Sequence, residues 1–239
     1  MHRTIDPGIL YFGTPVVLVS TLNEDGSPNL APMSSAWWLG RRCLLGFGAR
    51  SKTPQNILRT GECVLNLPSA ELVARVDRLA LTTGSNPMPE HKIKWGYRHE
   101  PDKFGIAGLT PAASVTVQPP RVLECPVQLE ATLRHAHPLC EENDESRGRL
   151  VALEVEIEQV HVEENILVQG KPDHIDPDKW SPLIMSFQHF YGLGRRLQDS
   201  RLASIPESFY RARPAAAQTA DHETGAEEHA PRLLQSSMR

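Results

Sequence analysis

The chain has 239 residues, of which 40% are hydrophobic, and its formal net charge is −4 at pH 7. This length and apolar content suffice for one sizeable core or at most two small ones. The slightly acidic balance argues against a nucleic-acid partner, and the apolar runs are much shorter than the ~18 residues that a membrane helix needs, which argues against a membrane partner.

The N-terminal residues MHRTIDPGILYFG lack the continuous apolar segment of a secretory signal. The four cysteines are widely spaced and form no CxxC pair. Reduced, mostly buried thiols in a cytoplasmic protein fit this pattern better than disulfides or a metal site. We therefore expect a cytoplasmic localisation.

Residues 1–14 are interpreted as a lead-in whose apolar residues, Ile9 to Phe12, pack against the domain or against a second subunit. The chain then enters a stretch, residues 15–68, that is predicted to form strand, turn, strand, tight turn, strand, short helix and strand. Three of these strands are the β-rich runs PVVLVS, RCLLGFG and ECVLNL. The Gly, Asn, Asp and Pro residues between them are typical of hairpins.

A polar insert, SKTPQN, stands where the strand RCLLGFG passes into the helix. Thr53 is predicted to be the N-cap and Pro54 the first helical residue. The unpaired backbone N–H groups of a helix start attract anions, Lys52 adds a positive charge, and Ser51 and Thr53 add hydroxyl donors. The pattern predicts a phosphate site, although no P-loop motif is present. The alternative is an ordinary helix cap beside a solvated lysine.

Residues 70–83 have apolar positions at the spacing of an amphipathic helix. A long irregular segment, 84–114, follows; loops of this length are usually functional covers or interface arms. It carries Trp95, Tyr97 and Phe104, and its charged run His91, Lys92 and Lys94 is interpreted as solvated.

Strands return from Val115 onward, and LVALEVEIEQVHV (150–162) alternates as a half-buried antiparallel strand does. Residues 180–202 are predicted to hold a helix or helical turn before Gly192. Residues 212–239 are poor in bulky apolar residues and are predicted to be a disordered tail behind a folded domain of residues 1–211.

Three ordered segments resemble the flavin reductase-like (flavoredoxin-like) branch of the FMN-binding split-barrel family. They are PVVLVSTLNEDGSPNLAPMSSAWWLG, ARSKTPQNILRTGECVLNLPS and DKFGIAGLTPAASVTVQPPRVLECPVQLEA. A weaker similarity extends the match over roughly residues 8 to 205. The resemblance implies a mainly β fold with peripheral helices, namely an antiparallel, Greek-key split β-barrel.

The resemblance also implies FMN held without a covalent bond, near a homodimer interface. Members of this family take hydride from NADH or NADPH onto the flavin and pass electrons to free flavin or an electron-accepting protein. This chain is accordingly expected to be an NAD(P)H-dependent flavin oxidoreductase, and one form of this activity is the reductase component of a two-component system. The alternatives are an FMN-binding electron carrier or sensor without nicotinamide turnover, and a split barrel that binds haem or acts on a pyridoxine phosphate.

By position, the resemblance assigns two groups of residues to FMN. The residues expected along the isoalloxazine ring are Met33, Ser34, Ser35, Ala36 and Trp37. The residues expected at the ribityl phosphate are Arg50, Ser51, Lys52, Thr53 and Asn56. Many relatives carry a phenylalanine or small residue where Trp37 and Trp38 stand, which would narrow the exposed flavin face here.

Several of these residues also have purely structural interpretations. Ser34 and Ser35 either bond locally or donate to the polar ring edge, which would tune the flavin potential. Asn66, an amide in an apolar strand, needs a partner that is either the flavin or a neighbouring backbone. Lys103 and Phe104 either close over the flavin or pack against the barrel. Trp37 and Trp38 are predicted to face opposite sides of a strand.

No constellation of nucleophile and base is present, and His135 and His137 lack a third ligand at metal-binding spacing. We therefore expect no catalytic side chain and no metal. Hydride transfer between nicotinamide and flavin needs no side-chain acid or base, because stacking geometry and exclusion of water suffice.

Overall fold

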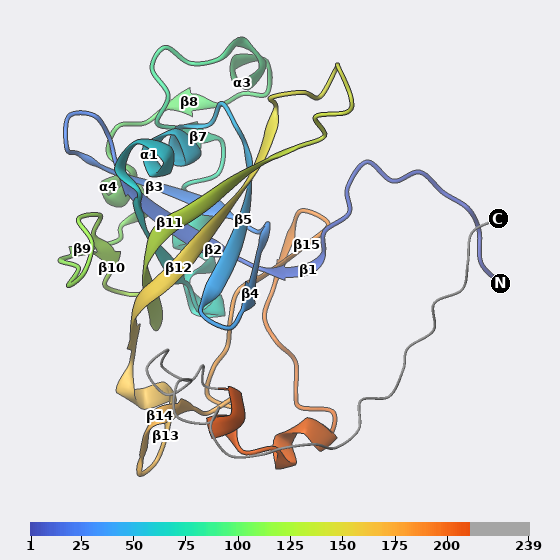
Figure 1. The fold of residues 1–239 in the computed structure, drawn as a ribbon, viewed down its shortest axis with the longest axis vertical. Coiled ribbons are helices and arrows are strands. Elements are labelled where there is room, and N and C mark those ends of the chain that lie inside the picture. Colours follow the sequence, from blue (N-terminus) through green and yellow to red (C-terminus); the bar gives the residue numbers. More distant parts are fainter. Residues whose placement is uncertain (211–239) are drawn as a thin grey trace, which may run out of the picture. The chain divides into compact units, whose positions relative to one another are not determined.

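The computed structural model describes residues 1–210, and its main body is a single seven-stranded antiparallel sheet (Figure 1). In spatial order the strands are β3 (Pro28–Met33), β2 (Val17–Leu22), β6 (Glu62–Leu67), β11 (Val127–Leu139), β12 (Leu150–Val162), β5 (Arg42–Gly48) and β4 (Ala36–Leu39). Every neighbouring pair is antiparallel. The predicted mainly β, antiparallel fold is confirmed.

The two edge strands of this sheet, β3 and β4, are consecutive in the chain and are separated only by Ser34 and Ser35. A chain of that length spans at most about 11 Å, so the sheet must curl until its two edges approach each other. The backbone N–H of Gly46 donates to the carbonyl of Ser35 at 2.8 Å, which holds the link against β5. No ladder joins β3 to β4 within residues 1–210, so the barrel is split.

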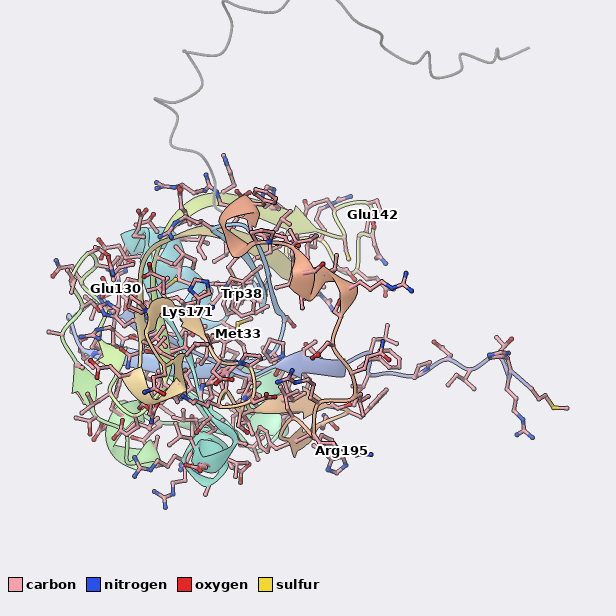
Figure 2. The ribbon with its side chains drawn as sticks, turned by 90° about the horizontal axis from the view of Figure 1, so that it is seen from below. Met33, Trp38, Glu130, Glu142, Lys171 and Arg195 are labelled. Atoms are coloured by element: carbon pink, nitrogen blue, oxygen red, sulfur yellow. The ribbon has the colours of Figure 1, made fainter. Side chains whose placement is uncertain are left out.

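The alternation along β12 places one set of apolar side chains inside the barrel. Val151, Leu153, Val155 and Ile157 are buried, and the glutamates between them lie on the other face. Met33 and Trp38, both labelled in Figure 2, pack against this inner cluster. The adjacent Trp37 is 53% exposed, which confirms that the two tryptophans face opposite sides.

Strand β2 is buried on both faces. Val17 and Val19 belong to the inner cluster, whereas Val16 and Leu18 belong to a second apolar cluster outside the barrel. Helices α2 (Val73–Asp77) and α4 (Lys103–Ala107) contribute to the second cluster. The first half of β2 and the residue before it, Val16 to Val19, therefore form a continuous apolar run, as expected for a strand covered on both sides.

Helix α1 (Lys52–Thr60) begins two residues earlier than predicted. Its N-cap is Ser51, which has extended backbone angles, whereas Thr53 lies inside the first turn. The helix ends at Gly61, which adopts φ 77° and donates its N–H to the carbonyl of Ile57. The prediction of Thr53 as the N-cap was wrong because Ser51 already supplies the chain reversal that starts the helix.

The helix predicted over 70–83 is shorter in the structure. A 3-10 turn, η1 (Ala70–Leu72), leads into α2, and residues 82–83 form a two-residue strand, β7 (Thr82–Thr83). Strand β7 pairs in parallel with β8 (Arg98–His99). The apolar face was correctly identified, since Val76 and Leu79 are buried in the second cluster, but Leu81 has φ 53° and ends the helical path.

The segment 84–114 carries more structure than expected. It contains α3 (Glu90–Lys94), β8, α4 and β9 (Pro111–Ala112), which pairs with β10 (Arg121–Val122). Figure 1 shows α1, α3, β7 and β8 gathered at one end of the sheet.

Residues 184–191 form a hairpin and not the predicted helix. Strands β15 (Ile184–Ser186) and β16 (His189–Tyr191) pair with each other, and β15 also pairs with β1 (Phe12–Pro15). The two turn residues Phe187 and Gln188 both have positive φ, as a tight hairpin turn requires. The helical spacing was misleading because the N-terminal lead-in supplies a strand partner.

Glu130 on β11 anchors the loop around residue 115. Its carboxylate accepts from the backbone N–H of Val115 at 2.8 Å, from the hydroxyl of Thr116 at 2.6 Å and from His161 Nε2 at 2.8 Å. Burial disfavours its charged form, but these hydrogen bonds prevail and lower the pKa of Glu130 to about 2. Figure 2 labels this residue.

The remaining elements of the first compact unit, residues 1–197, are η2 (Glu164–Ile166), β13 (Leu167–Val168) and β14 (Lys171–Ile175). The second unit begins at Gln198 and includes η3 (Arg201–Ser204) and η4 (Glu207–Tyr210). The predicted domain boundary at 211 and the predicted tail lie outside the described residues. Among residues 1–210, no helix is long and apolar enough to cross a membrane.

Candidate functional site

A cavity of about 390 Å³ opens at the end of the sheet where helix α1 begins. Its walls come from β3, from the end of β5, from the first turn of α1, and from the segments that carry β7 and α3. The lining residues are Asn29, Ala31, Pro32, Met33, Phe47, Gly48, Ser51, Lys52, Thr53, Leu79, Ala80, Leu81, Thr82, Thr83, Gly84, His91, Lys92, Trp95, Tyr97 and Lys103.

One polar corner of the cavity is the start of α1. The Ser51 hydroxyl makes no capping hydrogen bond to the helix, so it is available to a ligand. Thr53 is buried, and its Oγ1 accepts from Asn29 Nδ2 at 3.2 Å, which leaves its own O–H to donate. Together with the backbone N–H groups of the first turn, these hydroxyls form a donor set suited to an anion.

Lys52 stands at this corner and already has a partner. Its Nζ lies 2.5 Å from Oε2 of Glu24, and this hydrogen bond lowers the pKa of the Glu24 carboxyl. The Glu24 side chain is 64% exposed, so solvent screens the pair and the carboxylate can swing away. A second cavity, of about 290 Å³, lies on the Glu24 side and shares Lys52 and Gly84 with the first.

A second polar corner is formed by Lys92 and Lys103. Lys103 is only 3% exposed, and its Nζ donates to Thr82 Oγ1. Burial, reinforced by the nearby charge of Lys92, lowers the pKa of Lys103 to about 8. Lys92 Nζ donates to Thr83 Oγ1 at 3.0 Å, and burial lowers its pKa as well.

Neither of these two lysines forms an ion pair with any residue in the described part of the chain. Two desolvated ammonium groups without a carboxylate are costly unless an anion neutralises them. The cavity therefore offers donors and positive charge from two directions, and its remaining wall is apolar and aromatic through Met33, Phe47 and Trp95. This combination fits a phosphorylated cofactor with a planar ring, such as FMN.

The structure brings five of the predicted site residues together on the cavity wall: Met33, Ser51, Lys52, Thr53 and Lys103. The other eight do not line it, namely Ser34, Ser35, Ala36, Trp37, Arg50, Asn56, Asn66 and Phe104.

Most of these eight have other contacts. Ser35 Oγ lies 2.8 Å from the hydroxyl of Tyr11, and Ala36 is buried in the inner cluster. Arg50 is exposed. Phe104 is buried in the second cluster.

The two asparagines are bonded inside the protein. Asn66 Nδ2 donates to the carbonyl of Leu18 at 3.0 Å, and its Oδ1 accepts from the N–H of Val122 at 2.8 Å. Of the two partners considered for this amide, the structure gives it the neighbouring backbone. Asn56 Nδ2 donates to Thr21 and Asn23, so it supports the loop before β3 from inside.

Sequence reasoning identified Lys103 but missed the rest of the second polar corner. Thr82 and Thr83 were assigned to a helix, and Lys92 to a solvated run, although Lys92 is half-buried in the cavity. The available signal was the combination of adjacent threonines with a basic and aromatic segment ten residues later. That signal is weak without knowledge that β7 and β8 pair.

Comparisons with known proteins identify the family and the fold of this chain. A family model described as "Flavin reductase like domain" matches residues 9–194. The Bacillus subtilis (strain 168) protein YdfE, itself uncharacterized, is 40% identical over 195 residues, which are 82% of this chain and 91% of that protein.

Among solved structures, flavoredoxin of Desulfovibrio vulgaris (Miyazaki F) aligns with a TM-score of 0.68 at 24% identity, covering 85% of this chain and 99% of that chain. An FMN-binding domain of a flavin reductase-like enzyme from Shewanella baltica OS155 aligns with a TM-score of 0.58 at 16% identity, covering 78% of this chain and 90% of the other. These structures share the fold. The match of the family model over most of the chain shows that this protein belongs to the flavin reductase-like family.

Proposed function

We propose that this protein is an FMN-dependent oxidoreductase that passes hydride from NADH or NADPH to its flavin. Family membership supports a flavin-related oxidoreductase. The observation that carries the finer proposal is the cavity itself, in which two polar corners flank an aromatic and apolar wall. FMN offers a dianionic phosphate for one corner and a planar ring for the wall.

The start of α1 would hold the phosphate. Ser51, Lys52 and Thr53 together supply an ammonium group, two hydroxyls and the N–H groups of the first helical turn. Charge-assisted hydrogen bonds of this kind are about twice as strong as neutral ones. We propose that Arg50 approaches the same phosphate from the exposed surface. Asn56 would act indirectly, because it supports the loop that carries Glu24.

The ring would lie along the wall that contains Met33 and Phe47, with Lys103 near its polar edge. Bound flavin would accept the hydride, and this chain's contribution is to position the ring and exclude water. A buried ammonium such as that of Lys103 favours negative charge beside it. We propose that the residues after Met33 support this position of the ring, namely Ser34, Ser35, Ala36 and Trp37. Asn66 and Phe104 are buried and do not line the cavity, so they would support it through the protein interior.

We also propose that the protein is a homodimer. Apolar side chains that are more than half exposed occur on the lead-in, on β4 and around β16: Leu10, Phe12, Trp37, Leu39, Tyr191 and Leu193. The Tyr11–Ser35 hydrogen bond places the lead-in beside the β3–β4 link. An exposed apolar surface of this kind is typical of an interface. We expect the Phe12→Asp variant to sediment as a monomer and the wild-type protein to sediment as a dimer.

The direct test of function is spectroscopic. Purified protein, supplied with FMN if needed, is expected to be yellow and to bleach on anaerobic addition of NADH or NADPH. Lys52→Ala is expected to weaken FMN binding about tenfold or more, because a charged donor is lost. Protein that binds no FMN would refute the proposal. Protein that binds FMN but is reduced only by another protein would be an electron carrier instead of a reductase.

A further inference from the structure

The segment 87–97, here named the α3 cap, forms a part of the cavity wall that does not belong to the barrel. The N–H of Tyr97 donates to the carbonyl of Lys92 at 3.0 Å within the cap, and just after its C-terminal end the N–H of Arg98 donates to the carbonyl of Leu81 at 2.9 Å. The cap is therefore attached to β7 through β8. Four of its residues line the cavity: His91, Lys92, Trp95 and Tyr97.

Lys92 supplies this cap with an inward positive charge. It contacts Thr83 Oγ1 and lies 5.5 Å from the centre of the Tyr97 ring, and no carboxylate in the described chain pairs with it. The charged groups that act most strongly on Lys103 are Lys92, Glu100 and Arg98. Lys92 therefore brings positive charge to the cavity from a different element than the α1 corner, which has its own donor set for one phosphate.

Trp95 has the properties of a stacking surface. It lines the cavity, yet 67% of it is exposed, so it stands at the mouth. The ring of His91 meets it edge-on, with centroids 5.3 Å apart and an interplanar angle of 74°. An exposed indole supported in this way can stack on a planar base. Ile93 and Lys94, on the same helix, are exposed and do not line the cavity.

We propose that the α3 cap is the binding subsite for the dinucleotide hydride donor, in which Lys92 binds the donor's pyrophosphate and Trp95 stacks on its adenine. This inference rests on the proposed function. It assigns the α1 corner to the resident cofactor and the cap to the transient substrate. The cap must release its ligand in each cycle, and a largely exposed tryptophan and a single half-buried lysine suit weak, reversible binding.

The test measures binding by calorimetry on the FMN-loaded protein, with a tetrahydro analogue of NADH that cannot give up a hydride. Lys92→Met is expected to raise the Kd of this analogue about tenfold or more, whereas Lys94→Met, its neighbour on the same helix, changes it less than about twofold. Lys92→Arg is expected to restore most of the affinity, because it restores the charge. Equal affinities of Lys92→Met and Lys94→Met would overturn the proposal.

Trp95→Ala is expected to raise the Kd of the dinucleotide analogue roughly fivefold or more, with Ile93→Ala as its matched control. The same variant is expected to bind a mononucleotide analogue, which lacks the adenylate, as tightly as the wild type does. Equal affinities of Trp95→Ala and Ile93→Ala for the dinucleotide would overturn the stacking.

FMN affinity, measured in the same preparations, distinguishes a failure of this inference from a failure of the proposed function. Wild-type protein that binds FMN but not the analogue overturns this inference alone. Wild-type protein that binds no FMN overturns the proposed function, and with it the inference.

Discussion

The ammonium group of Lys52 lies 2.5 Å from the carboxylate of Glu24, at the boundary between two cavities. Glu24 therefore already pairs with the positive charge of Lys52, which the proposed phosphate would need. An internal carboxylate of this kind competes with an incoming anion, because one ammonium cannot fully satisfy both.

Glu24→Gln is accordingly expected to raise the affinity for FMN about two- to fivefold, since it releases Lys52 at little cost to the fold. Fluorescence titration of the apoprotein with FMN measures this effect. Asp25→Asn, which alters the adjacent carboxylate that bonds Ser27, is the control and is expected to leave the Kd unchanged. A weaker affinity in Glu24→Gln would show that Glu24 positions Lys52 for the phosphate.

The affinity for FMN is expected to fall as the pH rises above about 8. Burial holds the pKa of Lys103 at about 8 in the free protein, so the group loses its charge in this range, and an anion binds better to the protonated form. Titrations between pH 7 and 10 measure the change. Lys103→Met should bind FMN about tenfold more weakly at pH 7 and should lose the inflection near pH 8. An unchanged inflection in Lys103→Met would assign it to another group.

Asn66→Ala is expected to lower the free energy of unfolding by about 2 kcal/mol, because the buried N–H of Val122 loses its acceptor. Denaturant unfolding measures this change. The affinity for FMN in the folded fraction should stay within about twofold of wild type, since Asn66 does not line the cavity. A large loss of FMN affinity at unchanged stability would place Asn66 among the direct flavin contacts.

Glu130 is expected to dominate the acid side of the stability profile. Its pKa is about 2 in the folded protein, below the ordinary 4.5, so its contribution is fully present above pH 4.5 and is lost as the pH falls toward 2. This shift corresponds to about 3 kcal/mol. Thermal unfolding of Glu130→Gln between pH 3 and 7 should give a lower Tm at neutral pH and a flatter profile than wild type.

The exposed Glu142, at the far end of the β11–β12 hairpin, provides the comparison for this experiment (Figure 2). Glu142→Gln is expected to leave both the Tm at neutral pH and its acid dependence as in wild type. If Glu130→Gln behaved in the same way, the network around Val115 and Thr116 would contribute nothing to stability.

Sequence patterns identified β2, β5, β6 and β12 and located α1 to within two residues, because period-2 alternation and the polar insert SKTPQN are local signals. They predicted β3 and β4 as one strand. They failed where a strand depends on a distant partner. Residues 184–191 have helical spacing, yet they pair with β1 from the N-terminus. Thr82 and Thr83 likewise become a strand only through β8.

The candidate site was predictable only in part for the same reason. The α1 corner is contiguous in sequence, so Ser51, Lys52 and Thr53 could be identified together. Lys92 and Lys103 come from separate helices, and their shared environment arises from tertiary packing. Asn66 is the converse: its position as an amide in an apolar strand allowed a flavin contact, but its hydrogen bonds go to the protein's own backbone.

The Ser34–Ser35 link has a mechanical implication. In the described residues, no ladder joins β3 to β4, so the two edges of the sheet are connected at this point by the covalent chain. The separation of the edges is therefore limited by the length of the two-residue link and varies with its backbone torsion angles. Inserting glycines there should let the edges separate and the cavity beside Met33 widen. Inserting them at the exposed Cys140–Gly148 turn should leave the cavity unchanged.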